Sequence, residues 1–241
     1  MNNTGTIIAL AWPDTKVVCE GKWYDEPMRW VGAIKDGKYN AGHAAFLLID
    51  NKSGTIQYFD FGRYHTPMKY GRVRSKLTDP DIEMNHKAII KEGKITNLDE
   101  ILLERYRNKA CHGDGRLTAA IVKSINHDKA FNKVMRMQER EAIYYGPFEF
   151  GGTTCSRLVA QTVLTSSSNW LTKLMVIFPY TVSATPRSNN KVLNDCCHYY
   201  EVDNDVITMK KSKFFWFKKI FKKRRKEEIK ISVNNLAIDS I

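Results

Sequence analysis

The sequence predicts a mixed α+β fold, with one globular domain over residues 1–209 and a basic tail over residues 210–241. Three observations support this prediction. The front of the chain is rich in short apolar runs typical of strands, residues 79–145 have the spacing of helices, and strand-like runs return near the end. We find no internal repeat and no linker-like segment within the domain, so we expect a single catalytic unit plus the tail.

Composition narrows the class of protein. A hydrophobic content of 43% and an aromatic content of 11% are typical of a globular core. No apolar run approaches the roughly 20 residues of a membrane-spanning helix, and the N-terminus lacks the basic residues of a signal peptide. Five cysteines form an odd count without a CxxC motif, which argues against a disulfide framework. We therefore expect a cytoplasmic protein with reduced thiols, although a missing signal does not exclude export by a dedicated secretion machine.

The front of the chain predicts an antiparallel sheet. Residues 41–62 carry the clearest pattern, because two apolar runs flank the turn-forming sequence NKSG and so predict a β-hairpin. Both runs are apolar on both faces, which indicates a hairpin in the centre of a covered sheet. Further strands are expected at residues 6–12, 28–35 and 69–75.

The middle of the chain predicts a helical block over residues 79–145, ended by Gly146-Pro147. Four helices are expected there: one from Asp79-Pro80 through Ile90, one from residues 97–107, one after the Gly113-Asp114-Gly115 turn, and one starting at His127-Asp128. Late strands are expected at residues 174–178, 198–202 and 205–209, the last two as a hairpin.

The stretch GGTTCSRLVAQTV places Cys155 in the first turn of an apolar helix. Thr153 or Thr154 is a suitable N-cap, and the unpaired N–H groups and the positive end of the helix dipole favour thiolate over thiol. A cysteine in this position is a candidate nucleophile. The alternative is a small buried cysteine that packs the helix against the sheet.

A thiol nucleophile needs a base that is itself oriented by a third polar group. His43 is the candidate base, because it is the first residue of a buried strand, where packing alone does not explain the presence of an imidazole. The alternative is a core histidine bonded to backbone. With the hairpin turn centred on Lys52-Ser53, His43 lies opposite Gly62 and diagonal to Asp60, on the same face of the sheet. Asp60 is therefore the candidate orienting residue, with a bond to Arg63 or to a turn N–H as its alternative.

A Gly-His at the start of a buried strand, a polar residue on the next strand and a distant cysteine at a helix start resemble the circularly permuted papain-like cysteine hydrolases. That group includes permuted bacterial NlpC-type amidases and the lecithin retinol acyltransferases. The segment Thr154-Cys155-Ser156-Arg157-Leu158 loosely matches the NCxxF-like cysteine motif of the group. The orienting residue in relatives is often His, Asn or Gln, so Asp60 is a departure from the pattern. The resemblance covers about residues 6–62 and 150–180.

The resemblance implies an enzyme with thiol-based acyl chemistry, in which Cys155 attacks an amide, ester or thioester and His43 acts as the base. The substrate would be peptide-like or acyl, the activity a hydrolase or an acyltransferase, and no cofactor is required. Trp12 and Tyr64 are candidates for the wall of the substrate cleft, with core packing as the alternative. Arg63, together with Arg72 and Arg74, is a candidate to bind an anionic group of the substrate, with solvated arginines at a strand edge as the alternative. The pairs Cys111-His112 and Cys197-His198 lack the spacing of zinc ligands, so no metal site is predicted.

The basic tail is the second informative feature. Residues 210–230 hold eleven of the 38 basic residues and only two acids, so most of the net charge of +12 belongs to the tail. Aromatic side chains alternate with these lysines, which predicts an interfacial helix that binds an anionic membrane surface; they are Phe214, Phe215, Trp216, Phe217 and Phe221. Packing of the aromatics on the domain and binding of nucleic acid are the alternatives, nucleic acid being the less favoured.

Two functions from different classes remain open on the sequence alone. The first is the thiol hydrolase or acyltransferase, held at a membrane surface or a partner by its tail. The second is a non-catalytic binding module that retains a papain-like fold and binds anionic membrane or nucleic acid through the tail.

Overall fold

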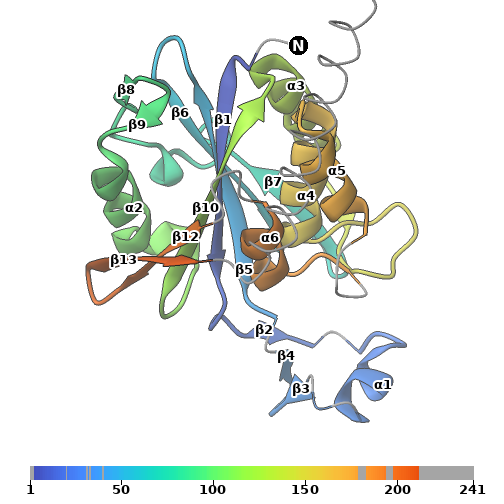
Figure 1. Ribbon diagram of the computed structural model, residues 1–241. Helices are drawn as coiled ribbons and strands as arrows, with labels where there is room; N and C mark the ends of the chain where they lie inside the picture. Colours follow the sequence, from blue (N-terminus) through green and yellow to red (C-terminus); the bar gives the residue numbers. More distant parts are fainter. Residues whose placement is uncertain are drawn as a thin grey trace, which may run out of the picture.

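The computed structural model describes residues 3–19, 21–30, 32, 34–39, 41–178, 183–193 and 198–211 of the chain. These residues form an eight-stranded sheet in the order β11-β7-β6-β5-β1-β10-β12-β13, with every neighbouring pair antiparallel (Figure 1). The strands are β1 (Gly5–Trp12), β5 (His43–Asp50), β6 (Ile56–Gly62), β7 (Tyr70–Arg74), β10 (Leu117–Ile125), β11 (Ile143–Tyr144), β12 (His198–Asp203) and β13 (Val206–Lys211).

Helices cover both faces of this sheet. Figure 1 shows α3 (His127–Gln138), α4 (Cys155–Ser166), α5 (Trp170–Ile177) and α6 (Pro186–Val192) on one side, and α2 (Leu98–Arg107) on the other. Two short 3₁₀ turns, η1 (Pro80–Ile82) and η2 (Lys109–Cys111), and the small β8 (Ile90–Lys91) and β9 (Lys94–Ile95) hairpin complete the α2 side.

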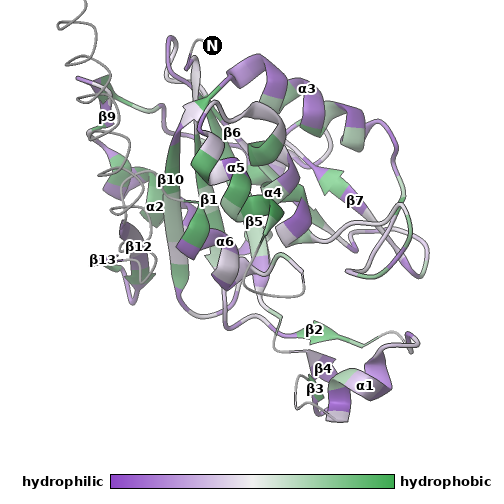
Figure 2. Cartoon of the chain, turned by 45° about the vertical axis from the view of Figure 1, so that its right-hand side comes forward, coloured by the Kyte–Doolittle hydropathy of each residue, from purple (hydrophilic) through white to green (hydrophobic). Residues whose placement is uncertain are grey.

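The central strands are buried on both faces because their side chains alternate between two hydrophobic clusters. On β1, Ile7 and Ala9 pack with α3 and α4, whereas Ile8 and Leu10 pack with α2. Figure 2 shows β1 and β10 in hydrophobic colours along most of their length. The prediction that the 41–62 hairpin lies in the centre of a covered sheet is confirmed, since β5 is paired on both edges.

A small unit projects from one end of the main sheet, below β5 in Figure 1. It consists of a three-stranded sheet in the order β2-β4-β3 together with the short helix α1 (Asp25–Trp30). Its strands are β2 (Val17–Val18), β3 (Ile34–Lys35) and β4 (Lys38–Tyr39). The strand predicted at residues 28–35 is therefore wrong for its first half, which belongs to α1.

The helical block predicted at residues 79–145 is only partly correct. The helices at 97–107 and from His127 are present as α2 and α3, but the helix expected through Ile90 is only the turn η1 followed by β8. The segment after Gly115 is the central strand β10 rather than a helix. Its apolar and β-branched residues are buried between β1 and β12, and burial on both faces removes the alternation that identifies a strand.

The end of the described chain differs from the prediction in two places. Residues 174–177 belong to α5 (Trp170–Ile177) rather than to a strand, and Phe178 is the C-cap of that helix. The Asn169 side chain accepts from the N–H groups of Leu171 and Thr172 and so starts a helix in this apolar run. The hairpin predicted near residues 198–209 is present, but β13 extends to Lys211. The boundary predicted between 209 and 210 therefore falls inside a strand, and the aromatic part of the tail lies outside the described residues. No helix in the described part of the chain is long and apolar enough to cross a bilayer.

Candidate active site

His43 is the first residue of β5, opposite Trp12 at the end of β1. The residue before it must be glycine, because Gly42 has a φ of +73° and a Cβ there would lie 2.9 Å from the carbonyl oxygen of Trp12. His43 itself is 8% exposed, and the indole of Trp12 stacks against its imidazole with ring centroids 5.8 Å apart. The ring is thus fixed by its strand and by an aromatic neighbour.

The hairpin register places Asp60 beside this imidazole. Ala45 pairs with Asp60 and Phe46 with Phe59, which is the register predicted from the turn. Nε2 of His43 lies 3.2 Å from Oδ2 of Asp60. This contact leaves Nδ1 of the imidazole for the thiol.

Asp60 is fully buried and is bound by more donors than the sequence suggests. The guanidinium of Arg74 donates from Nε to Oδ1 at 2.9 Å and from Nη2 to Oδ2 at 2.6 Å. The hydroxyls of Tyr58 and Tyr64 donate to Oδ2 at 3.0 and 3.1 Å. These charge-assisted contacts hold the carboxylate ionised although it has no access to water.

Cys155 is the first residue of α4 and is 5% exposed. Thr154 is the N-cap, and its side chain accepts from the N–H of Arg157. The Cys155 sulfur lies 3.9 Å from Oγ of Ser156, and the His43 side chain and the backbone N–H of Ala44 are near enough to stabilise its thiolate. The structure therefore brings the predicted nucleophile, base and orienting residue into one connected line.

The pKa shifts of Asp60, His43 and Cys155 favour a negatively charged thiol group beside a positively charged imidazole. Burial alone would raise the pKa of the Cys155 thiol, but the hydrogen bond and the positive charge of His43 outweigh it, so the pKa lies below its ordinary value. Burial alone would lower the pKa of His43, but the bonds to Asp60 and Cys155 raise the pKa to about 9. Asp60 has a pKa well below its usual range, because the bonds from His43 and Arg74 overcome the effect of burial. A thiolate beside an imidazolium is the form that these shifts support.

The family of the chain follows from its sequence. The profile of the family described as "Type VI secretion system effector TseH-like" matches residues 7–171, well over half of the 241-residue chain. This chain belongs to the TseH-like family. A search of curated protein sequences found no significant match.

A solved structure supports the same assignment at the level of fold. The TseH-like chain superimposes on the crystal structure of the type VI secretion system effector TseH with a TM-score of 0.53 and 18% sequence identity. The match covers 88% of this chain and 100% of that one. The TseH-like profile spans His43, Asp60 and Cys155, so the whole line of contacts lies within the matched region.

The three residues predicted to line the substrate cleft have different places in the TseH-like fold. Arg63 lines the cleft beside Cys155. Trp12 is 1% exposed and lies against His43, and Tyr64 donates to Asp60 beneath the guanidinium of Arg74, which is 3.6 Å from its ring centroid. Trp12 and Tyr64 therefore support the site from within the fold and do not line the cleft.

Sequence reasoning missed Tyr58 and the N–H of Ala44, and it assigned Arg72 and Arg74 to an anionic substrate group, whereas Arg74 pairs with Asp60 and Arg72 with Asp79. The sequence carries one signal for Arg74, because it lies on a strand expected next to the hairpin, and a buried aspartate needs a cationic partner. The backbone N–H of Ala44 helps to stabilise the Cys155 thiolate because of how α4 packs on β5. Every residue except proline has such an N–H, so the sequence gives no signal for it.

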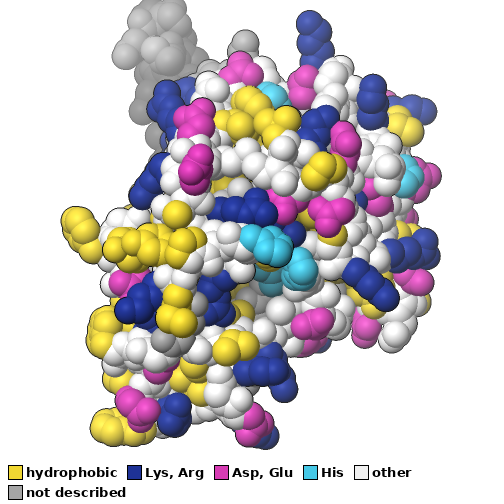
Figure 3. Space-filling view, turned by 180° about the vertical axis from the view of Figure 1, so that it is seen from behind, with side chains coloured by type: hydrophobic (Ala, Val, Ile, Leu, Met, Phe, Trp, Pro, Cys, Tyr) yellow, Lys and Arg dark blue, Asp and Glu magenta, His cyan; other side chains and the backbone are white. Residues whose placement is uncertain are grey.

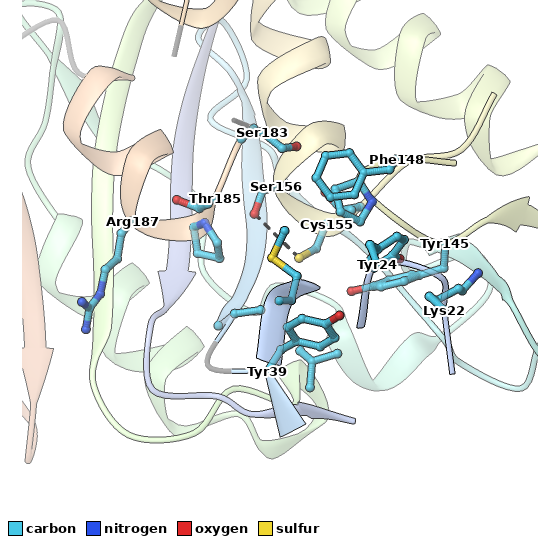
Figure 4. Close-up of a pocket in the computed structure, with 18 of the residues that line it drawn as sticks. Lys22, Tyr24, Tyr39, Tyr145, Phe148, Cys155, Ser156, Ser183, Thr185 and Arg187 are labelled. Atoms are coloured by element: carbon cyan, nitrogen blue, oxygen red, sulfur yellow. Dashed lines mark hydrogen bonds between the residues drawn. The ribbon is translucent and has the colours of Figure 1, made fainter. Parts of the chain in front are cut away.

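A cleft of about 970 Å³ opens in front of Cys155, between the main body and the small unit. Figure 4 shows the thiol between Ser156 and Thr185 on one side and Tyr24 and Tyr145 on the other. Residues 13–42 supply much of the opposite wall, which the sequence did not predict. Within the described residues, no group of three His, Cys, Asp or Glu side chains is placed to hold a metal ion.

Proposed function

We propose that this TseH-like protein is a thiol-dependent hydrolase or acyltransferase with a circularly permuted papain-like fold, acting on an amide, ester or thioester. The observation that carries the proposal is the line of contacts from Asp60 through His43 to Cys155. His43 precedes Cys155 in the chain, which is the permuted order. Because its family is described as TseH-like type VI secretion effectors, we also propose that the protein acts as such an effector, on a peptide-like or acyl substrate.

The chemistry begins with the thiolate of Cys155, which attacks the carbonyl carbon of the substrate. The oxyanion forms next to the first turn of α4, where backbone N–H groups have no partner within the helix and the helix dipole is positive. His43 then donates its proton to the leaving nitrogen, oxygen or sulfur, and the acyl group remains on Cys155 as a thioester. Neutral His43 then takes a proton from water or another acceptor, which attacks the thioester, releases the acyl group and restores the thiolate of Cys155 beside the imidazolium of His43.

The other residues of the line hold this geometry. Asp60 stabilises the imidazolium and fixes the tautomer of His43. Arg74, Tyr58 and Tyr64 keep Asp60 ionised and in place, and Trp12 fixes the plane of the ring. The site thus contains every group that the two half-reactions require.

Hydrolysis of a generic ester such as p-nitrophenyl acetate tests the proposal. We expect Cys155→Ala and His43→Ala each to lower kcat/KM by about 100-fold or more, because each change removes a group that takes part in covalent or proton-transfer chemistry. Cys111→Ala is the matched control, since Cys111 is also a buried cysteine but lies outside the line. Circular dichroism checks that all three variants are folded. Hydrolysis that survives loss of Cys155 or His43 would show that the dyad is wrong, and no hydrolysis above background by the unchanged chain would favour the non-catalytic binding module.

A further inference from the structure

The residues that line the cleft in front of Cys155 indicate which chemical groups of a substrate it can bind. Its volume lies at the upper end of the range typical of ligand-binding pockets. The part of the wall supplied by the small unit is mainly apolar, with Val17, Val18, Met28 and the ring of Tyr39 among its residues. A preference for charged substrates would require a charged side chain that is free to bind them.

Two of the charged side chains in the lining are neutralised within the small unit and its neighbourhood. Lys22 forms a salt bridge with Glu149, with Nζ 3.1 Å from Oε1, and its side chain is only 9% exposed. Asp25 is buried, accepts the backbone N–H of Lys22 at 2.9 Å, and is also bound by the hydroxyl of Tyr39. Neither group can bind a substrate charge without losing a partner that it already has.

The remaining three charged side chains of the lining are one acid, Asp14, and two arginines, Arg63 and Arg187. Arg63 donates to the carbonyl oxygen of Val18 at 2.9 Å. Asp14 pairs with Arg116 at 3.1 Å at the rim. Arg187 is exposed, and Figure 4 shows its side chain directed away from Cys155.

The apolar lining continues from the cleft to the surface. The ring of Tyr24 packs on Phe148 with centroids 5.2 Å apart, and Trp23 packs on both at 5.5 and 6.1 Å. Trp23 is 72% exposed and Trp30, on α1, is 86% exposed. Figure 3 shows hydrophobic side chains gathered at the lower left of the view, where the small unit lies. A substrate with an apolar group therefore meets an apolar path from solvent to the thiol.

We propose that this cleft binds the substrate through an uncharged, apolar group attached to the reacting carbonyl, and that the small unit of residues 13–42 selects it. This inference rests on the proposed function in one respect: the bound group is taken to be part of the substrate whose carbonyl Cys155 attacks. Two sources share this chemistry: a long alkyl chain and the apolar side chain of a peptide. A carboxylate at the far end of the group is disfavoured, because the apolar wall of the described cleft would strip it of water.

The test measures binding without turnover, on the full chain carrying Cys155→Ala. Ligand-observed NMR compares octanamide with suberamate, an amide of the same length whose chain ends in a carboxylate. We expect octanamide to bind at least about tenfold more tightly, because burial of an unpaired carboxylate is strongly unfavourable. Equal affinities, tighter binding of suberamate, or no binding of octanamide would overturn the proposal. Each of these results concerns the cleft alone, whereas failure of the proposed function appears as ester hydrolysis that does not need Cys155.

Two matched variants locate the preference. Met28→Glu places a charge in the wall of the cleft and should weaken octanamide binding at least about tenfold. Met68→Glu is the control, because Met68 is 77% exposed and does not line the cleft, so octanamide should bind as before. Equal effects of the two changes would remove the small unit from the selection. If Met28→Glu fails to fold, the comparison of the two ligands still decides the proposal.

N-acetylleucinamide, added as a third ligand, distinguishes the two sources of the apolar group. Tighter binding of octanamide indicates an alkyl chain, and tighter binding of N-acetylleucinamide indicates a peptide. Both outcomes support an apolar substrate group.

Discussion

Asp60 is the residue whose surroundings most restrict what the site can do. Its carboxylate is fully buried, and it is paired with an Arg74 guanidinium that is itself 2% exposed. A second bidentate pair of the same kind, Arg72 with Asp79, lies nearer the surface, with side-chain exposures of 20% and 15%. The two pairs have the same chemistry and differ in burial, so they allow the contribution of burial to be measured.

We expect Asp60→Asn to lower the free energy of unfolding by about 3–5 kcal/mol, because it leaves the buried Arg74 charge without a partner. Asp79→Asn should cost less, about 1 kcal/mol, since solvent reaches this partly exposed pair and screens it. Urea unfolding at pH 7 measures both. Equal costs for the two variants would show that burial does not set the strength of the pair.

The pKa of Asp60 is lowered in the folded state, so the contribution of Asp60 to the free energy of unfolding is present above about pH 4 and is lost as the pH falls further. In Asp60→Asn the free energy of unfolding should therefore fall less steeply with decreasing pH.

The reactivity of Cys155 gives a second prediction at the residue scale. Its thiolate fraction is reported by the rate of alkylation with iodoacetamide, followed at each cysteine by peptide mass spectrometry. Cys155 should react with a midpoint below the ordinary thiol pKa, because His43 stabilises its thiolate. Cys111 is the internal control: it is also buried, and burial raises its pKa to about 11.

Substitutions of His43 and Asp60 should raise the pH midpoint of Cys155 alkylation by different amounts. His43→Ala should raise it most, since it removes the imidazolium that stabilises the thiolate. Asp60→Asn should raise it less, because His43 remains but loses the bond and charge that help to raise its pKa. A midpoint for Cys155 equal to that of Cys111, or one unchanged in His43→Ala, would contradict the thiolate–imidazolium pair.

Among the elements, the start of β5 decides where the imidazole lies. Gly42 and Gly37 both have a positive φ, +73° and +70°, so alanine at either position costs about 1 kcal/mol or more in backbone strain. A Cβ at Gly42 would in addition meet the Trp12 carbonyl oxygen at 2.9 Å, whereas one at Gly37 meets nothing within 4 Å.

Gly42→Ala should therefore lower both stability and ester hydrolysis, and Gly37→Ala should lower stability alone. Urea unfolding and kcat/KM for p-nitrophenyl acetate measure the two effects. Hydrolysis reduced equally by both changes would show that the close approach at Gly42 does not position His43.

The elements also show how far the sequence could lead. The His43–Asp60 geometry was predictable because a tight turn fixes the register of a hairpin, and side chains alternate strictly along strands. The Cys155 helix was predictable from its N-cap and its apolar spacing. β10 was not, because its stretch Leu117–Val122 is buried on both faces and so lacks the alternation that identifies a strand. The Arg74 pair and the cleft depend on which segments meet in space, and local sequence does not encode that.

On the scale of the whole molecule, the contacts among Asp60, His43 and Cys155 and the wall of the cleft belong to different parts of the chain. The main sheet and α4 hold the line rigidly, with β5 and β1 buried between helices on both faces. The cleft wall comes from the small unit, inserted between β1 and β5. Such a division would let the wall change its substrate preference while the chemistry of the site stays the same.

The tail is the part of the molecule whose role stays a prediction. The TseH-like profile ends at residue 171, and residues 212–241 lie outside the described residues. If the tail binds an anionic membrane surface, each fully inserted ring should contribute about 1.5–3 kcal/mol, independent of salt. Each basic residue near the surface should add roughly 1 kcal/mol, which salt screens.

A truncation tests this, and the structure fixes where to make it. Ending the chain at Met209 would cut into β13, so the chain should end at Lys211. The truncated protein should keep its circular dichroism spectrum and its ester hydrolysis but lose binding to anionic vesicles in a sedimentation assay. The full chain should bind anionic vesicles more tightly than neutral ones, and more weakly as salt rises.

A charge-preserving variant separates the two forces. Replacement of the tail aromatics by serine keeps every lysine and arginine; the residues are Phe214, Phe215, Trp216, Phe217 and Phe221. This variant should retain only the salt-sensitive part of the binding, because its basic residues remain while its insertable surface is gone. Equal binding by the full and truncated chains would remove the anchor, and a single-stranded oligonucleotide that displaces the vesicles would favour nucleic acid. Unfolding on truncation would instead place the aromatics in the core, because only side chains that pack on the domain can stabilise it.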